Sequence, residues 1–400
     1  MDLKSGYPFW AVKSGLMQTY PPLGADLRCE VAVIGAGITG AIVSDALLDA
    51  GFDVAVFEQR DVGWGSSAAS TALLQYEIDT HLTDLSGEVG QRRPAMAYPA
   101  CQDAIGQLHE LAQDVGGADF RMSDSLYFAS RRWHVRRLRA EYEARSRAGL
   151  ETHWLDGADV ARGYGLDAPG ALLTHVAARM DPYRLTHRLL QRLRRRGGNV
   201  FGRTRLEPVR AGPRRVVLES GEGARVVADH VVVAAGYESQ RWIDQRLARN
   251  RSSYACISEP VELGALARTM VWESARPYLY LRSTGDSRLL VGGEDDAVDI
   301  PRRRDARVEK KADRLLARVA DLFPHLSVKP AFAWAGTFAE TKDGLPFFGP
   351  HPQWGPRVLF AMAYGGNGIV YSMLGAGLLR ARLERRAHPL RALFGFERLR

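Results

Sequence analysis

Along most of the chain, short continuous runs of apolar residues alternate with segments in which apolar residues recur at helical spacing. A run from Val31 to Ile34 leads through glycines into a helical pattern that stops at Gly51. A second run, Val54 to Phe57, follows directly. Runs that are apolar at every position are typical of strands buried on both faces of a parallel sheet. The pattern therefore predicts a strand–helix–strand unit near the start of the chain.

Two helices and another buried strand are marked by clear boundary residues. One helix follows Asp181, a capping residue, and Pro182, which suits a first turn. Gly197 is placed to end it. A second amphipathic pattern begins at Val308 and is stopped by Pro324. The run 231–234 predicts a further buried strand that ends in a glycine turn.

Other segments alternate apolar and polar residues, which is typical of antiparallel strands with one face buried. They are found near residues 123–130, 254–263 and 276–293. The fold class we expect is α/β: a Rossmann-like domain with a parallel sheet and helices, plus a smaller α+β domain with a mostly antiparallel sheet. The predicted divisions are an N-terminal arm at 1–27, the parallel-sheet domain at 28–100, 176–245 and 335–400, and the second domain at 101–175 and 246–334.

The stretch from Val358 to Leu379 has 22 residues and no charge. Its length would suffice for a membrane helix. Gly365, Gly366 and Gly368 disfavour one continuous helix. We expect a buried strand, a turn and a buried helix that begins near Asn367, and no membrane span.

Composition and charge narrow the class of protein. Apolar residues make up 46% of the chain and charged residues 25%, which is ordinary for a soluble globular protein. The net charge is +8, and the basic runs are interrupted by apolar residues at helical spacing. We interpret these runs as solvated helix faces and do not expect a nucleic-acid partner.

The cysteines and the N-terminal residues bear on the cellular compartment of the protein. The three cysteines form no C-x-x-C pair, so we expect neither a disulfide framework nor a metal site. The first residues lack a basic segment followed by an apolar core, so no secretory signal is expected. A cytoplasmic location is the prediction that follows.

A dinucleotide-binding fingerprint lies between the first two predicted strands. Its glycines are spaced G-x-G-x-x-G, and Glu58, at the end of the second strand, stands 18 residues after the last of them. The glycines allow a tight turn, a close approach of a pyrophosphate and tight helix packing. Glu58 would accept hydrogen bonds from a ribose and would repel a 2′-phosphate. The residues of the fingerprint are Gly35, Ala36, Gly37, Ile38, Thr39 and Gly40. The pattern alone does not separate FAD from NAD.

The segment after Glu58 is rich in small hydrogen-bonding residues. Ser66, Ser67, Ser70 and Thr71 belong to "GSSAASTALL", which can wrap closely around a diphosphate or a ring system. An NAD-dependent dehydrogenase would usually continue into the next helix instead. This segment therefore favours FAD.

Seven pieces in order resemble the D-amino-acid oxidase family, which includes glycine oxidase and sarcosine oxidase. They are "VIGAGITG" with Glu58, "GSSAASTALL", "DPYRLTHRLL", "VVVAAGYES", "YLYLRSTGDSRLLVGG", "ETKDGLPFFGP" and "YGGNGIVYS". The resemblance spans residues 28–385 and implies that the parallel-sheet domain binds FAD and that the other domain binds substrate. The implied cofactor residues beyond those above are Gln59, Arg60, Leu206, Ala235, Gly236, Gly366, Asn367, Gly368 and Ile369.

The resemblance puts the flavin's pyrimidine edge at the helix that starts near Asn367. Free backbone N–H groups there would stabilise the negative charge of a reduced flavin. The resemblance also places Lys342 and Asp343 near the ring. Family members with covalent flavin use a Cys or His where this chain has Phe338 and "SSAAST", so we expect non-covalent FAD.

The substrate side is predicted from residues 276–293. Tyr278, Tyr280 and Arg282 alternate with leucines, so one face of a strand would carry all three. An arginine beside two phenols suits a carboxylate, and Arg282 matches the family's carboxylate-binding arginine in position. Glu77 in "QYEID" is a candidate contact for a substrate amine.

These features predict oxidation of the C–N bond in a small amine or amino acid, by hydride transfer to flavin N5. Electrons would then pass to oxygen, a quinone or a carrier protein. Three alternatives stay open: a 2-hydroxy-acid dehydrogenase, a flavoenzyme that acts on a modified tRNA base, and a non-catalytic FAD-bearing subunit.

Overall fold

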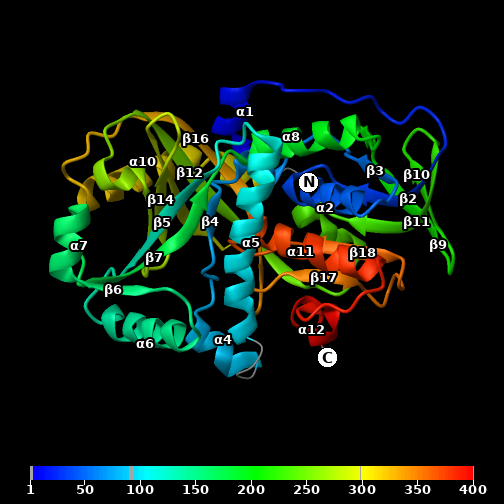
Figure 1. Cartoon of the computed structure of the whole chain (residues 1–400). Helices are drawn as coiled ribbons and strands as arrows, with labels where there is room; N and C mark the ends of the chain where they lie inside the picture. The colour runs from blue at the N-terminus through cyan, green and yellow to red at the C-terminus, as the bar shows by residue number, and fades with distance from the viewer. Residues whose placement is uncertain (1–2, 90–93, 298, 400) are drawn as a thin grey trace.

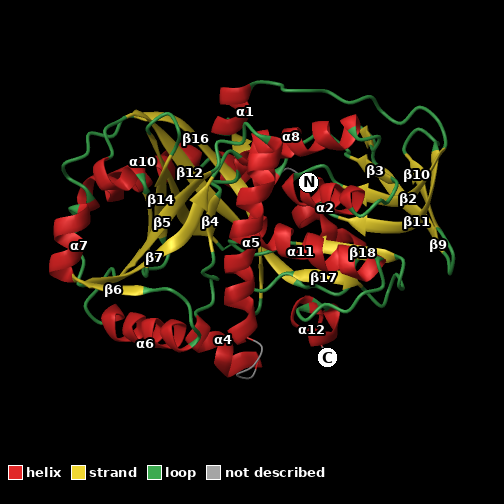
Figure 2. Cartoon of the chain, in the orientation of Figure 1, coloured by secondary structure: helices red, strands yellow, loops and turns green. Residues whose placement is uncertain are grey.

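A computed structural model describes residues 3–89, 94–297 and 299–399, and these residues form two large β-sheets that lie side by side. Figure 1 shows α5 (Pro94–Val115) standing between the two lobes. Figure 2 shows helices at the outer side of the left-hand sheet and around the right-hand one. The predicted fold class, a parallel-sheet domain joined to a mostly antiparallel one, is confirmed.

The first sheet is the predicted parallel one. Its strand order is β17 (Phe347–Pro350), β18 (Val358–Met362), β11 (Arg225–Val233), β2 (Leu27–Ile34), β3 (Val54–Phe57) and β8 (Asn199–Phe201), with β9 (Leu206–Ala211) and β10 (Val216–Ser220) extending β11 as an antiparallel ribbon. All neighbours along the main path are parallel except β17 and β18. Val33 pairs with Val232 on one side and with Val56 on the other, so the fingerprint strand is central.

Two apolar layers enclose this sheet. Four helices cover one face: α2 (Ile38–Asp49), α5, α8 (Pro182–Arg195) and α11 (Gly368–Leu383). Val31 and Val33 point into that layer, whereas Ala32 and Ile34 point into a second layer on the other face. Burial on both faces explains why these strands have no polar alternation.

The second sheet is mostly antiparallel. Its order is β1 (Lys4–Gly6), β16 (Pro330–Thr341), β12 (Ala248–Pro260), β15 (Arg288–Asp296), β14 (Leu279–Ser283), β13 (Thr269–Glu273), β5 (Arg121–Phe128), β7 (Gly170–Arg179) and β4 (Leu73–Gln75), with β6 (His153–Asp156) paired to β7. The pair of β13 and β5 is parallel. Helix α10 (Val308–Leu322) packs on β12, β15 and β16.

The remaining helices connect and cover these layers. They are α1 (Phe9–Ser14), α3 (Ser66–Ala69), α4 (Leu82–Val89), α6 (His134–Arg147), α7 (Gly157–Tyr164), α9 (Pro301–Asp305) and α12 (Arg391–Phe394), with 3₁₀ helices η1 (Gly236–Trp242), η2 (Gly264–Ala267) and η3 (Phe396–Leu399). The described part of the predicted arm forms β1 and α1, and β1 adds an edge strand to the antiparallel sheet.

Most predicted element boundaries agree with the structure. The Asp181 carboxylate accepts a hydrogen bond from the Arg184 backbone N–H and so caps α8. The uncharged stretch forms β18 and α11, as expected. Within the described residues, no helix combines the length and the hydropathy that a membrane crossing requires.

The predicted domain boundaries at residues 100, 175 and 334 each fall inside an element, namely α5, β7 and β16. Helix α5 continues past residue 100 because its apolar side packs against α8 and α11. Strand β4 lies within the residues predicted for the parallel-sheet domain, but it pairs with β7 in the other sheet. A helix or strand that passes from one domain to the other keeps the same apolar pattern along its whole length. The domain boundary inside it therefore cannot be located from that pattern.

Candidate functional site

The fingerprint turn joins β2 to α2. Gly35 has φ of +106°, and a Cβ there would lie 2.4 Å from the Ala234 carbonyl oxygen. A Cβ on Gly40 would lie 1.8 Å from the Gly35 carbonyl oxygen. Residue 35 must therefore adopt a positive φ, which favours glycine, and residue 40 has no room for any side chain. Both requirements are those of a dinucleotide-binding turn.

Glu58 closes the turn from the end of β3. Its two carboxylate oxygens accept the backbone N–H groups of Ala36, at 3.0 Å, and of Arg60, at 2.9 Å. Burial raises the pKa of Glu58, and these two hydrogen bonds oppose the rise. Each oxygen keeps a lone pair for a further donor, such as a ribose hydroxyl.

The serine-rich segment folds as α3 against the start of α2. The Ser67 hydroxyl accepts the Ile38 N–H at 2.8 Å, so it holds one of the donors at the helix start. The Ser66 hydroxyl is buried and has no hydrogen-bond partner among the described residues. A buried hydroxyl without a partner at this point fits a phosphate or ribose oxygen.

One cavity extends from this turn to the antiparallel sheet. The predicted cofactor residues that line it are Gly35, Gly37, Ile38, Thr39, Glu58, Gln59, Arg60, Ser66, Ser67, Ser70, Thr71, Leu206, Ala235, Gly236, Gly366, Asn367, Gly368 and Ile369. Ala36 and Gly40 lie behind its wall, where they shape the turn. The cavity therefore has the elongated shape and the donor set that a dinucleotide requires.

The start of α11 differs from the prediction in one respect. The Gly366 backbone N–H donates to the Asp79 carboxylate at 2.8 Å, so this amide is not free. A Cβ on Gly366 would lie 2.7 Å from an Asp79 oxygen, which explains the glycine. The Asn367 side-chain amide donates to the carbonyls of Gln75, at 2.8 Å, and Glu77, at 3.3 Å. The loop 75–79 and the helix start are thus one hydrogen-bonded unit.

The far end of the cavity is aromatic and charged. Tyr278 and Tyr280, the two tyrosines predicted for the substrate side, line it together with Trp272, Asp79 and Arg276. The Arg276 guanidinium lies 4.5 Å from the centre of the Tyr278 ring. The Arg276 side chain is exposed. Arg276 precedes Pro277 and the strand, so the alternation of residues 278–282 did not point to it.

Arg282 is not part of the cavity lining, contrary to the position we predicted for it. Its guanidinium is 1% exposed and donates to the carbonyls of Thr71, at 2.6 Å, Met180, at 2.9 Å, and Ser283, at 3.0 Å. Burial lowers its pKa to about 9. All three nitrogens are occupied because the 71–72 turn and the end of β7 come against this side of β14. A role in holding substrate is therefore not supported for Arg282.

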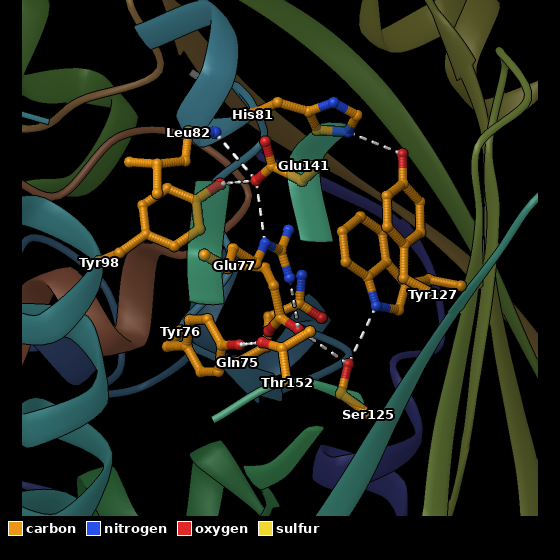
Figure 3. Close-up of polar contacts among 12 residues, drawn as sticks. Gln75, Tyr76, Glu77, His81, Leu82, Tyr98, Ser125, Tyr127, Glu141 and Thr152 are labelled. Carbon is orange, nitrogen blue, oxygen red and sulfur yellow. Dashed lines mark hydrogen bonds and ion pairs between the residues drawn. The ribbon is translucent and has the colours of Figure 1, made fainter. Parts of the chain in front are cut away.

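Glu77 lines the cavity, but it is also part of a buried charge network (Figure 3). Its Oε1 lies 3.4 Å from the Arg145 guanidinium, which in turn donates to Glu141 at 2.9 Å. All three side chains are at most 1% exposed. The other oxygen of Glu77, Oε2, is buried without a hydrogen-bond partner among the described residues. Burial raises the pKa of Glu77, whereas the Arg145 charge opposes the rise.

Glu141 anchors this network to α4. Its carboxylate accepts the backbone N–H groups of Leu82, at 3.0 Å, and Thr83, at 3.1 Å, which are donors at the helix start. Burial alone would raise the pKa of Glu141, but Arg145 and these donors bring it below its ordinary value. Glu141 is therefore the ionised partner of Arg145, and Glu77 is the carboxyl group that gains a proton more easily.

Hydrogen bonds also join Glu77 to the aromatic wall. The Trp272 indole N–H donates to the Ser125 hydroxyl at 3.0 Å, and this hydroxyl donates to Glu77 at 3.4 Å. The ring of Tyr127 stacks on the ring of Trp272, with 3.6 Å between the ring centroids. Ser125 and Tyr127, which do not line the cavity, therefore hold Glu77 and Trp272 in place from behind.

Two further expectations concern the loop 341–346 and the flavin linkage. Lys342 is exposed and Asp343 pairs with Arg398 at 3.0 Å, and neither lines the cavity. Phe338 does line it. The described lining residues include no Cys or His, and all three cysteines are buried elsewhere. The cavity thus offers no side chain of the kinds that usually carry a covalent flavin.

Comparisons with known proteins agree with this geometry. A family model described as FAD dependent oxidoreductase (DAO) matches residues 30–382. The gamma-glutamylputrescine oxidoreductase of Escherichia coli (strain K12) is 26% identical over 394 residues, covering 94% of this chain and 88% of the relative. The glycine oxidase of Geobacillus kaustophilus (strain HTA426) is 27% identical over 375 residues, covering 90% of this chain and 93% of the relative.

A solved structure supports the same fold. The crystal structure of glycine oxidase from Geobacillus kaustophilus superimposes with a TM-score of 0.80 at 22% identity, over 92% of this chain and 98% of that chain. The fingerprint turn, the continuous cavity and a family model that covers most of the chain all lead to one assignment. The chain is a flavoprotein enzyme of the DAO family of FAD-dependent oxidoreductases, with FAD as its cofactor.

Proposed function

We propose that this enzyme oxidises the C–N bond of a small amine or amino acid that carries a carboxylate. The single observation that supports this most is the far end of the cavity. There an exposed arginine, Arg276, and a carboxylate with an unpartnered oxygen, Glu77, line the same space as Tyr278 and Tyr280. A molecule with one negative and one positive end matches this pair of charges. The names of the relatives, glycine oxidase and gamma-glutamylputrescine oxidoreductase, agree with an amine substrate.

In this proposal Arg276 takes the role that the sequence suggested for Arg282. A guanidinium can hold a carboxylate through two parallel hydrogen bonds. Stacking on Tyr278 limits the freedom of the Arg276 side chain, so less entropy is lost when substrate binds. Tyr280 and Trp272 exclude water from the same region, which strengthens the interaction.

Glu77 receives the proton of the substrate ammonium group at Oε2. An amine must lose this proton before its carbon can release a hydride. The raised pKa of Glu77 makes its carboxylate a better proton acceptor than an exposed one. Bound FAD supplies the two-electron acceptor for the hydride. The aromatic wall and the 75–79 loop orient the substrate's C–H bond, and the imine product is hydrolysed by water.

The test compares a carboxylated amine, such as glycine or sarcosine, with its neutral amide, by anaerobic bleaching of the flavin absorbance. Arg276→Gln should lower kcat/KM for the carboxylated amine roughly 10- to 100-fold, the loss expected for a charge-assisted hydrogen bond. The value for the amide should stay within about twofold.

Arg131→Gln is the matched control, because Arg131 also stacks on an aromatic ring, that of Trp133, but does not line the cavity. Its kinetics should equal those of the wild type. An Arg276→Gln enzyme with unchanged kcat/KM for carboxylated amines would disprove the role of Arg276. A flavin that no amine reduces, although 2-hydroxy acids do, would instead support the hydroxy-acid alternative, which needs no proton acceptor for an ammonium group.

A further inference from the structure

Three side chains of the kinds that bind metals lie together on the mostly antiparallel sheet, away from the cavity. His153 begins β6, Glu151 stands two residues before it, and His175 lies on the neighbouring strand β7. The register pairs His153 with Leu173, so His175 is its diagonal neighbour across the two strands. One ligand atom from each of the three side chains lies within 4.8 Å of the other two. None of the three lines the flavin cavity.

The spacing within this cluster suits a small dication. His153 Nε2 and Glu151 Oε1 are 3.3 Å apart. Two ligands bound tetrahedrally to Zn²⁺, each at about 2.0–2.1 Å, are separated by about 3.3–3.4 Å. These two groups therefore already stand at the edge length of a zinc tetrahedron. The third ligand atom, on His175, lies within 4.8 Å of both of them.

A fourth residue orients His175 in the way that metal sites require. The Asp124 carboxylate lies 2.8 Å from Nδ1 of His175. Asp124 is at a register shift between β5 and β7, between Ser123 and Ser125, which puts its side chain beside the histidine. A carboxylate on one ring nitrogen fixes the tautomer and leaves the other nitrogen, Nε2, as a ligand. Asp124 therefore orients a ligand of the cluster without being a ligand itself.

Two isolated acid–histidine pairs are the simpler interpretation of the same contacts. Pairs this exposed contribute little to stability, because solvent screens them. They do not explain why the two histidines converge, with ring centres 5.4 Å apart.

We propose that Glu151, His153 and His175 bind one Zn²⁺ ion, with Asp124 as a positioning residue for His175. This site lies outside the flavin cavity and does not depend on the proposed substrate. It differs from the expectation of no metal that the cysteine pattern suggested, because its ligands come from histidines that only the sheet brings together. The four side chains are about half or one-third exposed, at 52% for His153, 50% for Glu151, 47% for His175 and 35% for Asp124. The fourth coordination position is therefore open to water or to another ligand.

The ion would stabilise an edge of the sheet. Strand β6 pairs with β7 alone among the described strands, and α7 begins directly after it. A metal that bridges β6 and β7 adds a link across this edge. It binds only the folded arrangement, so it should raise the temperature of unfolding.

The test is calorimetric titration of the FAD-loaded, EDTA-treated protein with ZnCl₂ at pH 7.5. One equivalent should bind the wild type. His153→Asn and His175→Asn should each weaken binding by at least about tenfold, and Asp124→Asn by about 10- to 100-fold.

His325→Asn is the control, because His325 is an exposed histidine outside the cluster. It should bind Zn²⁺ as the wild type does, and Zn²⁺ should raise the unfolding temperature of both. Equal Zn²⁺ binding by the wild type and by the His153→Asn/His175→Asn double variant would overturn the proposal. So would the absence of a saturable equivalent in the wild type.

Discussion

Arg276 and Arg282 stand six positions apart and have opposite surroundings. The guanidinium of Arg282 is buried and donates hydrogen bonds to three backbone carbonyls. Arg276 is exposed, stacks on Tyr278 and lines the cavity. A buried arginine with all its nitrogens occupied stabilises the fold, whereas one with free donors at a cavity can bind an anion.

Replacing Arg282 should therefore affect stability more than substrate binding. We expect Arg282→Met to lower the free energy of unfolding by about 3 kcal/mol or more, because three buried carbonyls lose a charged donor. Urea unfolding measures this. The KM of the fraction that stays folded should change less than twofold. A tenfold rise in KM with wild-type stability would restore Arg282 as the substrate anchor and would argue against Arg276.

At the scale of elements, the start of α11 and the loop 75–79 behave as one unit. Asn367 holds two loop carbonyls and Asp79 holds the Gly366 amide. The loop in turn is fixed from behind by Arg145 of α6, which pairs with Glu77 of the loop and with Glu141 on its own helix. Three elements, α4, α6 and α11, thus converge on one side of the cavity.

The glycine at the first position of α11 is a test of this unit. A Cβ on Gly368 would lie 3.0 Å from the Ala363 carbonyl oxygen, so Gly368→Val should shift the turn and weaken FAD binding by at least about tenfold. Gly377→Val is the control, since Gly377 lies on the same helix with no atom nearer than 4.0 Å to its Cβ position. Fluorescence titration of the apoprotein with FAD measures both. Equal affinities for the two variants would contradict the importance of this turn.

The charge network makes a separate prediction. Arg145→Met leaves two buried carboxylates without their counter-charge, so we expect a loss of about 3–5 kcal/mol in unfolding free energy and weaker FAD binding. The double variant Arg145→Met/Glu77→Gln should recover part of the stability, because one unpaired charge is removed. Urea unfolding of the two variants decides this. A double variant no more stable than the single one would show that Glu77 is not held by Arg145.

At the scale of the whole molecule, the two lobes share α5 and a continuous apolar layer that includes α8. His187 of α8 is fully buried in this region, and neither ring nitrogen has a hydrogen-bond partner among the described residues. Burial lowers the pKa of His187 to about 4, well below the value of an exposed histidine. The folded protein therefore holds this ring neutral.

This histidine makes stability depend on pH. Between pH 6.5 and about 4 the unfolded chain binds a proton at His187 that the folded chain does not, so stability is lost as pH falls through that range. From pH 7.5 to pH 5, His187 should account for about 2 kcal/mol of this loss. Urea unfolding at both pH values, with wild type and His187→Leu, isolates the effect. A loss of the same size in both proteins would rule out His187 as its source.

The sequence by itself determined the elements and the cofactor end of the site. Capping residues, glycines and buried runs act within a few positions, so Asp181, Gly35, Gly40 and the β2–α2–β3 unit were predictable. The fingerprint with Glu58 also predicted a dinucleotide cofactor, because the turn, the helix start and the acid belong to two consecutive strands and the helix between them. Local patterns suffice where the interacting groups are close in the sequence.

Only the tertiary structure decided the substrate end. Alternation placed Tyr278, Tyr280 and Arg282 on one face of a strand, but what lies against that face depends on which loop approaches it. The carbonyls of Thr71 and Met180 accept hydrogen bonds from Arg282, whereas the two tyrosines line the cavity. In the same way Glu77 gained Arg145, 68 positions away, as its partner. Contacts between segments this distant are set by how the two sheets pack, and no pattern within a single segment records that packing.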